Sequence, residues 1–424
     1  MGKIRKRLLD NVYLTYVSAT KFKTDFLSAQ FITPLRRETA GLNALLPAVL
    51  QRGTKRYSDM QRLNAAQDLL YGANIEHSVR KRGENLLWGF VATCIDDSFV
   101  PGEERLLEPL AELIGELMCD PAMEDGLLRR DYVDSERNNL IEMIRAGINE
   151  KRTYAGKRLL EEMCREESYG ISHIGEEDTV SVITAESLTK HYFRELKESR
   201  LELYYCGRAE LERVEKAFCA AFQTLPERKE CALAPATEHP AAAECRFVQD
   251  RMDVTQGKLC LGYSVASEDK DAVTMLNAMF GGTSNSKLFL NVREKLSLCY
   301  YASSGYHRAK NIITVSSGIE FANYQKALDE IEAQMDAMRR GDWEEWEFTA
   351  AMSSIANSYQ SLADSAGRME DYYLGQVATC VDRGPEESLA AIQTVTAERI
   401  IAAAATVKLD TVYFLTGKED ECDA

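Results

Sequence analysis

Residues 280–307 read FGGTSNSKLFLNVREKLSLCYYASSGYH, and the stretch combines a turn, a helix and a strand in immediate succession. The pair Gly281-Gly282 marks a tight turn, because glycine is a strong breaker of regular structure. Residues 286–296 then predict a helix, and the aromatic run of residues 299–307 predicts a strand. The turn is not a phosphate loop, since the pattern G-x-x-x-x-G-K-[ST] is absent.

The same order of elements occurs in both halves of the chain. In the first half we expect strand-like segments at 21–35, 78–83 and 85–94, and helices from Leu42, over 59–71, over 106–118 and from about 123 to 143 and beyond. In the second half we expect strand-like segments at 258–265, 299–307 and 311–320, and helices over 271–280, 286–296, 324–338 and 343–362. Strands and helices that are segregated in this way predict an α+β fold with an antiparallel-rich sheet covered by helices. Internal duplication accounts for the repeated order.

A break separates the two halves. Residues 225–246, LPERKECALAPATEHPAAAECR, carry three prolines and many alanines and show no apolar periodicity. This is the composition of a linker. We therefore expect an N-terminal repeat at 1–224, a linker at 225–246 and a C-terminal repeat at 247–424.

Composition limits the class of partner and compartment. The chain has 424 residues and a formal net charge of −16, so it would be repelled by phosphate backbones, and nucleic acid is not an expected partner. Its 11 cysteines form no C-x-x-C pair, which is typical of thiols in a reducing compartment rather than of a disulfide framework or a zinc module. No stretch approaches the ~20 apolar residues of a membrane span. These features predict a cytoplasmic protein without a membrane partner.

The stretch 280–307 resembles the second repeat of insulinase/pitrilysin-type peptidases, the inverzincins. That family has an F-G-G turn, a Ser-rich segment, an L-F helix, R-E and then L-x-Y at the entry to a strand. The matching residues are Phe280, Gly281, Gly282, Ser284, Ser286, Leu288, Phe289, Arg293, Glu294, Leu298 and Tyr300. With the duplicated halves and the linker, the resemblance covers nearly the whole chain. It implies two tandem homologous α/β-roll repeats.

In that family the first helix of the first repeat carries H-x-x-E-H, whose histidines bind Zn²⁺ and whose glutamate activates the metal-bound water. The pattern falls here on residues 41–54, GLNALLPAVLQRGT. Ala44 and Ala48 occupy the histidine positions and Pro47 occupies the glutamate position. A methyl group has no lone pair for a metal, and proline is no base. With Asn43 as the N-cap, Pro47 would lie at the margin of the first turn, where proline is tolerated.

The family's later metal ligand is also missing. The family helix reads E-R-x-x-x-x-E-E and ends on the ligand, whereas SERNNLIEM places Met143 at that position. Glu142 lies one residue earlier, about 100° around a helix, and would point elsewhere. The five histidines, which include no pair at metal-ligand spacing, are His77, His173, His191, His239 and His307. The resemblance therefore implies that this chain holds no metal and no catalytic residue of its own.

The resemblance implies a substrate-binding role for Arg293 and Tyr300. In active family members an arginine and a tyrosine of the second repeat bind the peptide and stabilise the tetrahedral intermediate near the metal. A guanidinium offers a fixed fork of donors, and a phenol offers another donor to an oxyanion. The alternatives are that Arg293 pairs with a surface carboxylate near Glu294 and that Tyr300 only fills a strand. Tyr301 competes for the tyrosine role.

A missing metal site beside a retained arginine–tyrosine pair resembles the non-catalytic subunit of bacterial two-chain members of this family. The resemblance implies a partner subunit with H-x-x-E-H and Zn²⁺, a peptide substrate, and a heterodimeric endopeptidase. The isolated chain could form a homodimer. The alternative is a catalytically inactive scaffold or peptide-binding protein of the same fold.

Overall fold

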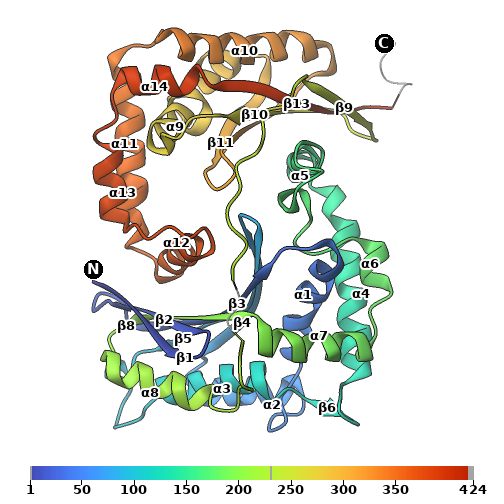
Figure 1. The fold of residues 1–424 in the computed structure, drawn as a ribbon, viewed down its shortest axis with the longest axis vertical. Helices are drawn as coiled ribbons and strands as arrows, with labels where there is room; N and C mark the ends of the chain where they lie inside the picture. Colours follow the sequence, from blue (N-terminus) through green and yellow to red (C-terminus); the bar gives the residue numbers. More distant parts are fainter. Residues whose placement is uncertain (1, 230–231, 419–424) are drawn as a thin grey trace. The chain divides into compact units, whose positions relative to one another are not determined.

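A computed structural model describes residues 2–229 and 232–418, which form two compact units (Figure 1). Unit 1 consists of Met1–Arg145, Ile171–Pro235 and Ala366–Val381, and unit 2 of Ala146–Gly170, Ala236–Ser365 and Asp382–Ala424. Within the described residues, every helix is too short or too polar to cross a lipid bilayer.

Unit 1 is built on a six-stranded sheet with the order β1-β2-β8-β3-β5-β4. Its strands are β1 (Lys3–Leu9), β2 (Val12–Ser18), β3 (Thr24–Pro34), β4 (Asn74–Arg82), β5 (Asn85–Ile95) and β8 (Arg200–Gly207). Its helices are α1 (Arg37–Leu50), α2 (Met60–Leu69), α3 (Leu107–Cys119), α4 (Arg130–Ala146), α6 (Glu177–Ser181), α7 (Ala185–Glu198), α8 (Leu211–Ala221) and α12 (Ala366–Ala378). The sheet is antiparallel except where β2 runs parallel to β8.

Unit 2 is built on a five-stranded sheet with the order β11-β12-β10-β13-β9. Its strands are β9 (Arg246–Arg251), β10 (Gly257–Val265), β11 (Cys299–His307), β12 (Ile312–Ile319) and β13 (Val407–Thr416). Its helices are α5 (Lys151–Met163), α9 (Lys270–Asn277), α10 (Tyr324–Arg340), α11 (Glu345–Leu362), α13 (Pro385–Ile392) and α14 (Ala397–Ala404), together with the π-helical segments η4 (Ala278–Gly282) and η5 (Leu288–Lys295). Again one pair, β13 with β9, is parallel.

The two sheets share one topology. The order β4-β5-β3-β8-β2 in unit 1 corresponds to β11-β12-β10-β13-β9 in unit 2, and the parallel pair occupies the same place in each. Within these two sheets, only β1 has no counterpart among the described strands. The predicted α+β fold of two tandem repeats, each an antiparallel-rich sheet covered by helices, is therefore confirmed.

Each sheet is covered on both faces, since successive side chains of a strand point to opposite sides. In β3, Leu27, Ala29 and Phe31 pack into the core formed with α1, α3 and α8, whereas Ile32 packs against α12. Figure 1 shows the sheet of unit 1 between α12 and the layer of α3 and α8. In β10, Leu261 packs into the main core of unit 2, and the neighbouring Cys260 packs against Leu159 of α5.

The helices on these second faces are exchanged between the sequence halves. Helix α5 follows α4 in the first half yet packs on the sheet of unit 2, and α12 follows α11 in the second half yet packs on the sheet of unit 1. The compact units are therefore not the continuous ranges 1–224 and 247–424 of the sequence analysis. Those ranges stay predictions for the repeats along the chain, and each half of the chain gives one helix to the sheet built mainly from the other half.

Two local predictions need correction. Residues 123–128 form a short hairpin, β6 (Met123–Glu124) and β7 (Leu127–Leu128), in place of the start of the expected long helix. Asp125, with a positive φ of 51°, and Gly126 form the turn of this hairpin, and this conformation is incompatible with a helix at these residues. The expected first helix begins five residues before Leu42, because α1 starts at Arg37.

Candidate functional site

Arg293 lies on the π-helical segment η5 of unit 2, where a regular helix was expected. The backbone N–H of Leu296 donates to the carbonyl of Asn291 at 3.1 Å, which is the i→i+5 bond of a widened turn. Ser297 then adopts φ of 51°, a left-handed conformation that is uncommon for a residue with a side chain, and ends the segment. The Arg293 guanidinium lies 4.6 Å from the ring centroid of Phe289.

Tyr300 lies at a β-bulge where edge strand β11 begins. Cys299 pairs with Ile319 and Tyr301 pairs with Gly318, so Tyr300 is the extra residue between two consecutive partners. A bulge re-aims the side chain of its extra residue and is frequent next to functional sites. The Tyr300 residue is 63% exposed and points to solvent.

Arg293 and Tyr300 line one surface cavity of about 420 Å³ in unit 2. The other lining residues are Glu294, Ser297, Leu298, Cys299, Glu320 and Asn323. The Nε atom of Arg293 is 3.5 Å from the carboxylate of Glu294, its direct neighbour, and the arginine side chain remains 41% exposed. The structure thus brings the two predicted donors to the same concave surface, where both face solvent. Their role there stays a prediction.

Tyr301, the competing tyrosine, has a different environment. Its ring lies 4.1 Å below the guanidinium of Arg152 from α5, and the ammonium of Lys258 is 5.9 Å from the same ring. Burial raises the pKa of Tyr301 above that of a free phenol. Because successive side chains of β11 point to opposite sides, Tyr301 packs within unit 2 and Tyr300 faces the cavity.

The residues at the family's H-x-x-E-H positions lie on α1 of unit 1. Ala44 and Pro47 are buried and Ala48 is partly buried. Because α1 begins at Arg37, Pro47 lies in the helix interior and not at the margin of a first turn capped by Asn43. Proline has no N–H to donate to the carbonyl four residues earlier, so this helix lacks one internal bond.

Polar contacts on the neighbouring elements hold α1 in place. His191 of α7 is buried, and its Nε2 donates to the side-chain oxygen of Asn43 at 2.6 Å. Arg194 donates to the other ring nitrogen at 2.7 Å, so the imidazole acts once as donor and once as acceptor and is neutral. Burial first, and then the charge of Arg194, lower the pKa of His191 to about 3.

The later ligand position, Met143, lies on α4 and is 58% exposed. Glu136, two turns earlier on the same face, pairs with Arg52 at 2.9 Å. Glu142 pairs with Arg145 at 2.8 Å on the exposed surface. Two methyl groups, a proline ring and a thioether do not make the nitrogen and oxygen donor set that a zinc ion requires, so the residues at these four family positions do not fit a catalytic zinc site.

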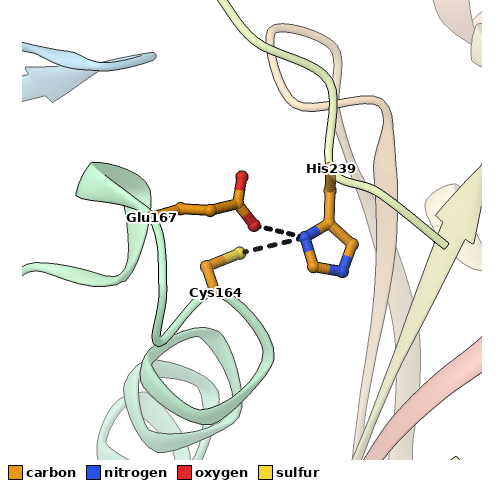
Figure 2. A group of neighbouring side chains, drawn as sticks. All are labelled: Cys164, Glu167 and His239. Carbon is orange, nitrogen blue, oxygen red and sulfur yellow. Dashed lines mark hydrogen bonds and ion pairs between the residues drawn. The ribbon is translucent and has the colours of Figure 1, made fainter. Parts of the chain in front are cut away.

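Sequence reasoning missed one group of side chains in unit 2. Cys164, Glu167 and His239 converge although the histidine lies 75 residues after the cysteine, in the segment expected to be a linker (Figure 2). A lone C-x-x-E spacing and a single distant histidine give no recognisable motif. Only the fold of unit 2 brings these three residues together.

Comparison with known proteins identifies the family. Residues 183–355 match the family described as "Peptidase M16 inactive domain". A Bacillus subtilis protein named "Probable inactive metalloprotease YmfF" is 35% identical over 407 residues, which cover 95% of this chain and 95% of that protein.

Solved structures share the fold over the full length. A conserved protein from Enterococcus faecalis is 26% identical with a TM-score of 0.90, and the match covers 98% of this chain and 99% of that one. A peptidase M16 inactive domain from Pseudomonas fluorescens has a TM-score of 0.80 at 14% identity and covers 99% of each chain. Together with the duplicated topology and the degenerate positions of α1, these matches show that the chain belongs to the M16 peptidase family, as a homologue of its inactive metalloproteases.

Proposed function

We propose that this chain is the non-catalytic subunit of a two-chain zinc endopeptidase, in which Arg293 and Tyr300 bind the peptide in the active site of a partner subunit. The observation that carries the proposal is the shared, solvent-facing cavity of these two side chains. Unit 1 offers no zinc ligands at the family positions, so the metal and the base must come from elsewhere for proteolysis to occur.

The backbone around this pair favours a functional role. A π-helical turn, a left-handed serine and a β-bulge occur within Leu288–Tyr301, and each is a departure from regular structure that occurs preferentially at functional sites. Their combination turns both donors toward one cavity.

The chemistry assigned to the pair is binding and charge stabilisation. The peptide would lie extended along an edge strand of the partner, as in β-augmentation. The Arg293 guanidinium would donate two parallel bonds to carbonyl oxygens, and the Tyr300 hydroxyl would donate to the oxygen that gains negative charge. The zinc of the partner's H-x-x-E-H motif would supply the activated water. The strong negative charge of this chain suits neither nucleic acid nor an anionic membrane as partner.

The test is reconstitution with an H-x-x-E-H partner of the same family. We expect the isolated chain, whether monomer or homodimer, to cleave no extended peptide, and the complex to cleave it in a zinc-dependent manner. Replacement Arg293→Ala should lower kcat of the complex by about 10²–10³-fold, the usual effect of losing a transition-state donor.

Two results would refute the proposal. One is peptide cleavage by the isolated chain. The other is a complex whose kcat and KM ignore both Arg293→Ala and Tyr300→Phe, which would assign the chain to the scaffold or peptide-binding class instead. Because the readout is kinetic, complex formation must first be shown to be equal for each variant by size-exclusion chromatography.

A further inference from the structure

Three side chains with metal-binding atoms converge in unit 2, away from Arg293 and Tyr300. Cys164 ends α5, Glu167 lies on the turn that follows, and His239 lies on the extended segment before β9 (Figure 2). The Nδ1 atom of His239 is 3.9 Å from the sulfur of Cys164 and 2.5 Å from a carboxylate oxygen of Glu167. All three ligand atoms lie within 4.8 Å of one another.

The surrounding contacts orient the imidazole. Its other nitrogen, Nε2, faces the carboxylate of Asp410 at 3.2 Å. Asp410 is fully buried and is itself fixed by the hydroxyl of Thr411 at 2.7 Å and the backbone N–H of Ala242 at 3.1 Å. A carboxylate on the distal nitrogen is the usual support of a metal-bound histidine, because it fixes the ring and raises the basicity of the ligating nitrogen.

Glu167 is oriented in the same way. The ammonium of Lys310, which is fully buried, pairs with the carboxylate oxygen that is turned away from His239. Lys310 also donates to the hydroxyl of Thr237 at 3.1 Å. One oxygen of Glu167 is therefore held by the lysine and the other is aimed at the common point of the three side chains.

We propose that Cys164, Glu167 and His239 form a zinc-binding site that attaches the segment between the two repeats to α5 and the sheet of unit 2. Thiolate, imidazole and carboxylate are the three ligand types that zinc accepts in proteins. Tetrahedral zinc would place the sulfur and Nδ1 about 3.5 Å apart and the nitrogen and carboxylate oxygen about 3.3 Å apart. The two observed distances, 3.9 Å and 2.5 Å, differ from these values by about 0.4 Å and about 0.8 Å.

Replacement of protons by zinc leaves the net charge of this buried site unchanged. With acceptors on both nitrogens, the metal-free ring carries two protons and a positive charge. Zn²⁺ binds the thiolate of Cys164 and the neutral imidazole of His239, so binding releases one proton from the sulfur and one from Nδ1. The two released protons carry the same total charge as the incoming Zn²⁺. Lys310 and Asp410 keep their partners throughout.

A nucleophilic role for the same cysteine does not suit its surroundings. The order Cys164, His239, Asp410 has the sequence of contacts of a catalytic triad. However, Cys164 has no exposed surface, so a substrate carbonyl does not reach the sulfur. A metal ion, which needs only a local opening to enter, suits a fully buried thiol better.

The experiment uses the full-length chain treated with EDTA, incubated with ZnCl₂ and desalted. We expect close to one zinc ion per chain by atomic emission and a higher melting temperature than that of the metal-free chain. Cys164→Ala and His239→Ala should each lose most of the zinc and the thermal shift. The matched control is Cys260→Ala, which removes another fully buried thiol of the same unit and should retain the metal.

Cobalt titration of the unaltered chain keeps the test decisive if a variant fails to fold. Bound Co²⁺ should show a thiolate-to-metal charge-transfer band in the near ultraviolet that zinc abolishes. Absence of zinc retention and of this band in the unaltered chain would overturn the proposal and leave an ion-pair network of Lys310, Glu167, His239 and Asp410. Equal zinc content in a folded Cys164→Ala variant would overturn it as well. The outcome is independent of peptidase activity in the complex.

Discussion

Arg80 of β4 and Glu370 of α12, separated by 290 residues in sequence, form a two-pronged ion pair in which both nitrogen–oxygen distances are 2.7 Å. Glu370 is 1% exposed and also accepts a bond from the hydroxyl of Ser28 at 2.9 Å. The pair fastens a helix from the second half of the chain to the sheet built from the first half. It is the polar counterpart of the apolar contacts between α12 and that sheet.

Removal of the carboxylate should therefore destabilise unit 1. Glu370→Ala leaves the Arg80 guanidinium without its buried partner, and breaking such a pair costs about 3–5 kcal/mol of unfolding free energy. Urea denaturation should show the loss. The adjacent Asp371→Ala is the matched control, because Asp371 is 45% exposed and its pairs with Arg80 and Arg82 are each worth under about 1 kcal/mol. Equal losses for both variants would contradict a special role of Glu370.

Substitutions of the two neighbouring tyrosines of β11 should have different effects on kcat of the reconstituted complex. Tyr300→Phe removes a solvent-facing donor and should lower kcat by about 10²-fold or more with little change in stability. Tyr301→Phe changes a side chain packed under Arg152 and should leave kcat within a few-fold. A larger effect of Tyr301→Phe would transfer the proposed role to that residue.

The position of α1 predicts that a metal site can be rebuilt in unit 1. Ala44→His and Ala48→His place two imidazoles one turn apart on one helix face, and Met143→Glu adds a carboxylate from α4. Isothermal titration in a Cys164→Ala background should detect zinc binding that is absent from that background alone. Failure of the folded variant to bind zinc would show that Met143 does not face the α1 positions.

Replacement of the proline in α1 should stabilise the protein. Pro47→Ala restores a backbone donor, whose absence in a helix interior costs ~3 kcal/mol, and loses part of this gain through the smaller buried side chain. A net rise of about 1 kcal/mol in unfolding free energy is expected from urea denaturation. A decrease would mean that the surrounding core is shaped around the proline ring.

His191 should make stability depend on pH. Its pKa is lowered from 6.5 to about 3, so between these values the unfolded chain binds a proton that the folded chain does not. Unfolding free energy should thus fall as pH drops from about 6.5 toward 3, by up to ~1.4 kcal/mol per pH unit from this group. His191→Gln keeps a donor for Asn43 and carries no titrating group, so its profile over this range should be shallower. Profiles of equal slope would contradict the assignment.

Much of the architecture is predictable from the sequence because it depends on local patterns. Alternating and helical apolar spacings indicate the two repeats, and the ordered motif from Phe280 to Tyr300 indicates the family. The two alanines and the proline of residues 44–48 can likewise be recognised from the sequence as replacements of the family's histidines and glutamate. These features need only residue type and spacing.

Other features depend on the fold as a whole and have no local signature. The crossing of α5 and α12 onto each other's sheets follows from which apolar faces meet, and both helices have ordinary amphipathic sequences. The widened turn at Arg293 and the bulge at Tyr300 depend on how η5 joins β11. Cys164 and His239 meet only because the segment before β9 passes the end of α5.

The reciprocal exchange of α5 and α12 also means that unit 1 can complete its fold only after most of the second half has been synthesised. The ribosome synthesises all strands of the unit 1 sheet well before residues 366–378. The apolar side chains of Ile32, Leu87 and Tyr204 therefore stay uncovered by α12 during much of translation. We expect stalled nascent chains that end before α12 to recruit chaperones and to be digested readily by protease. A premature stop codon shortly before the codon for residue 366 would then produce an aggregation-prone fragment and not a smaller folded protein.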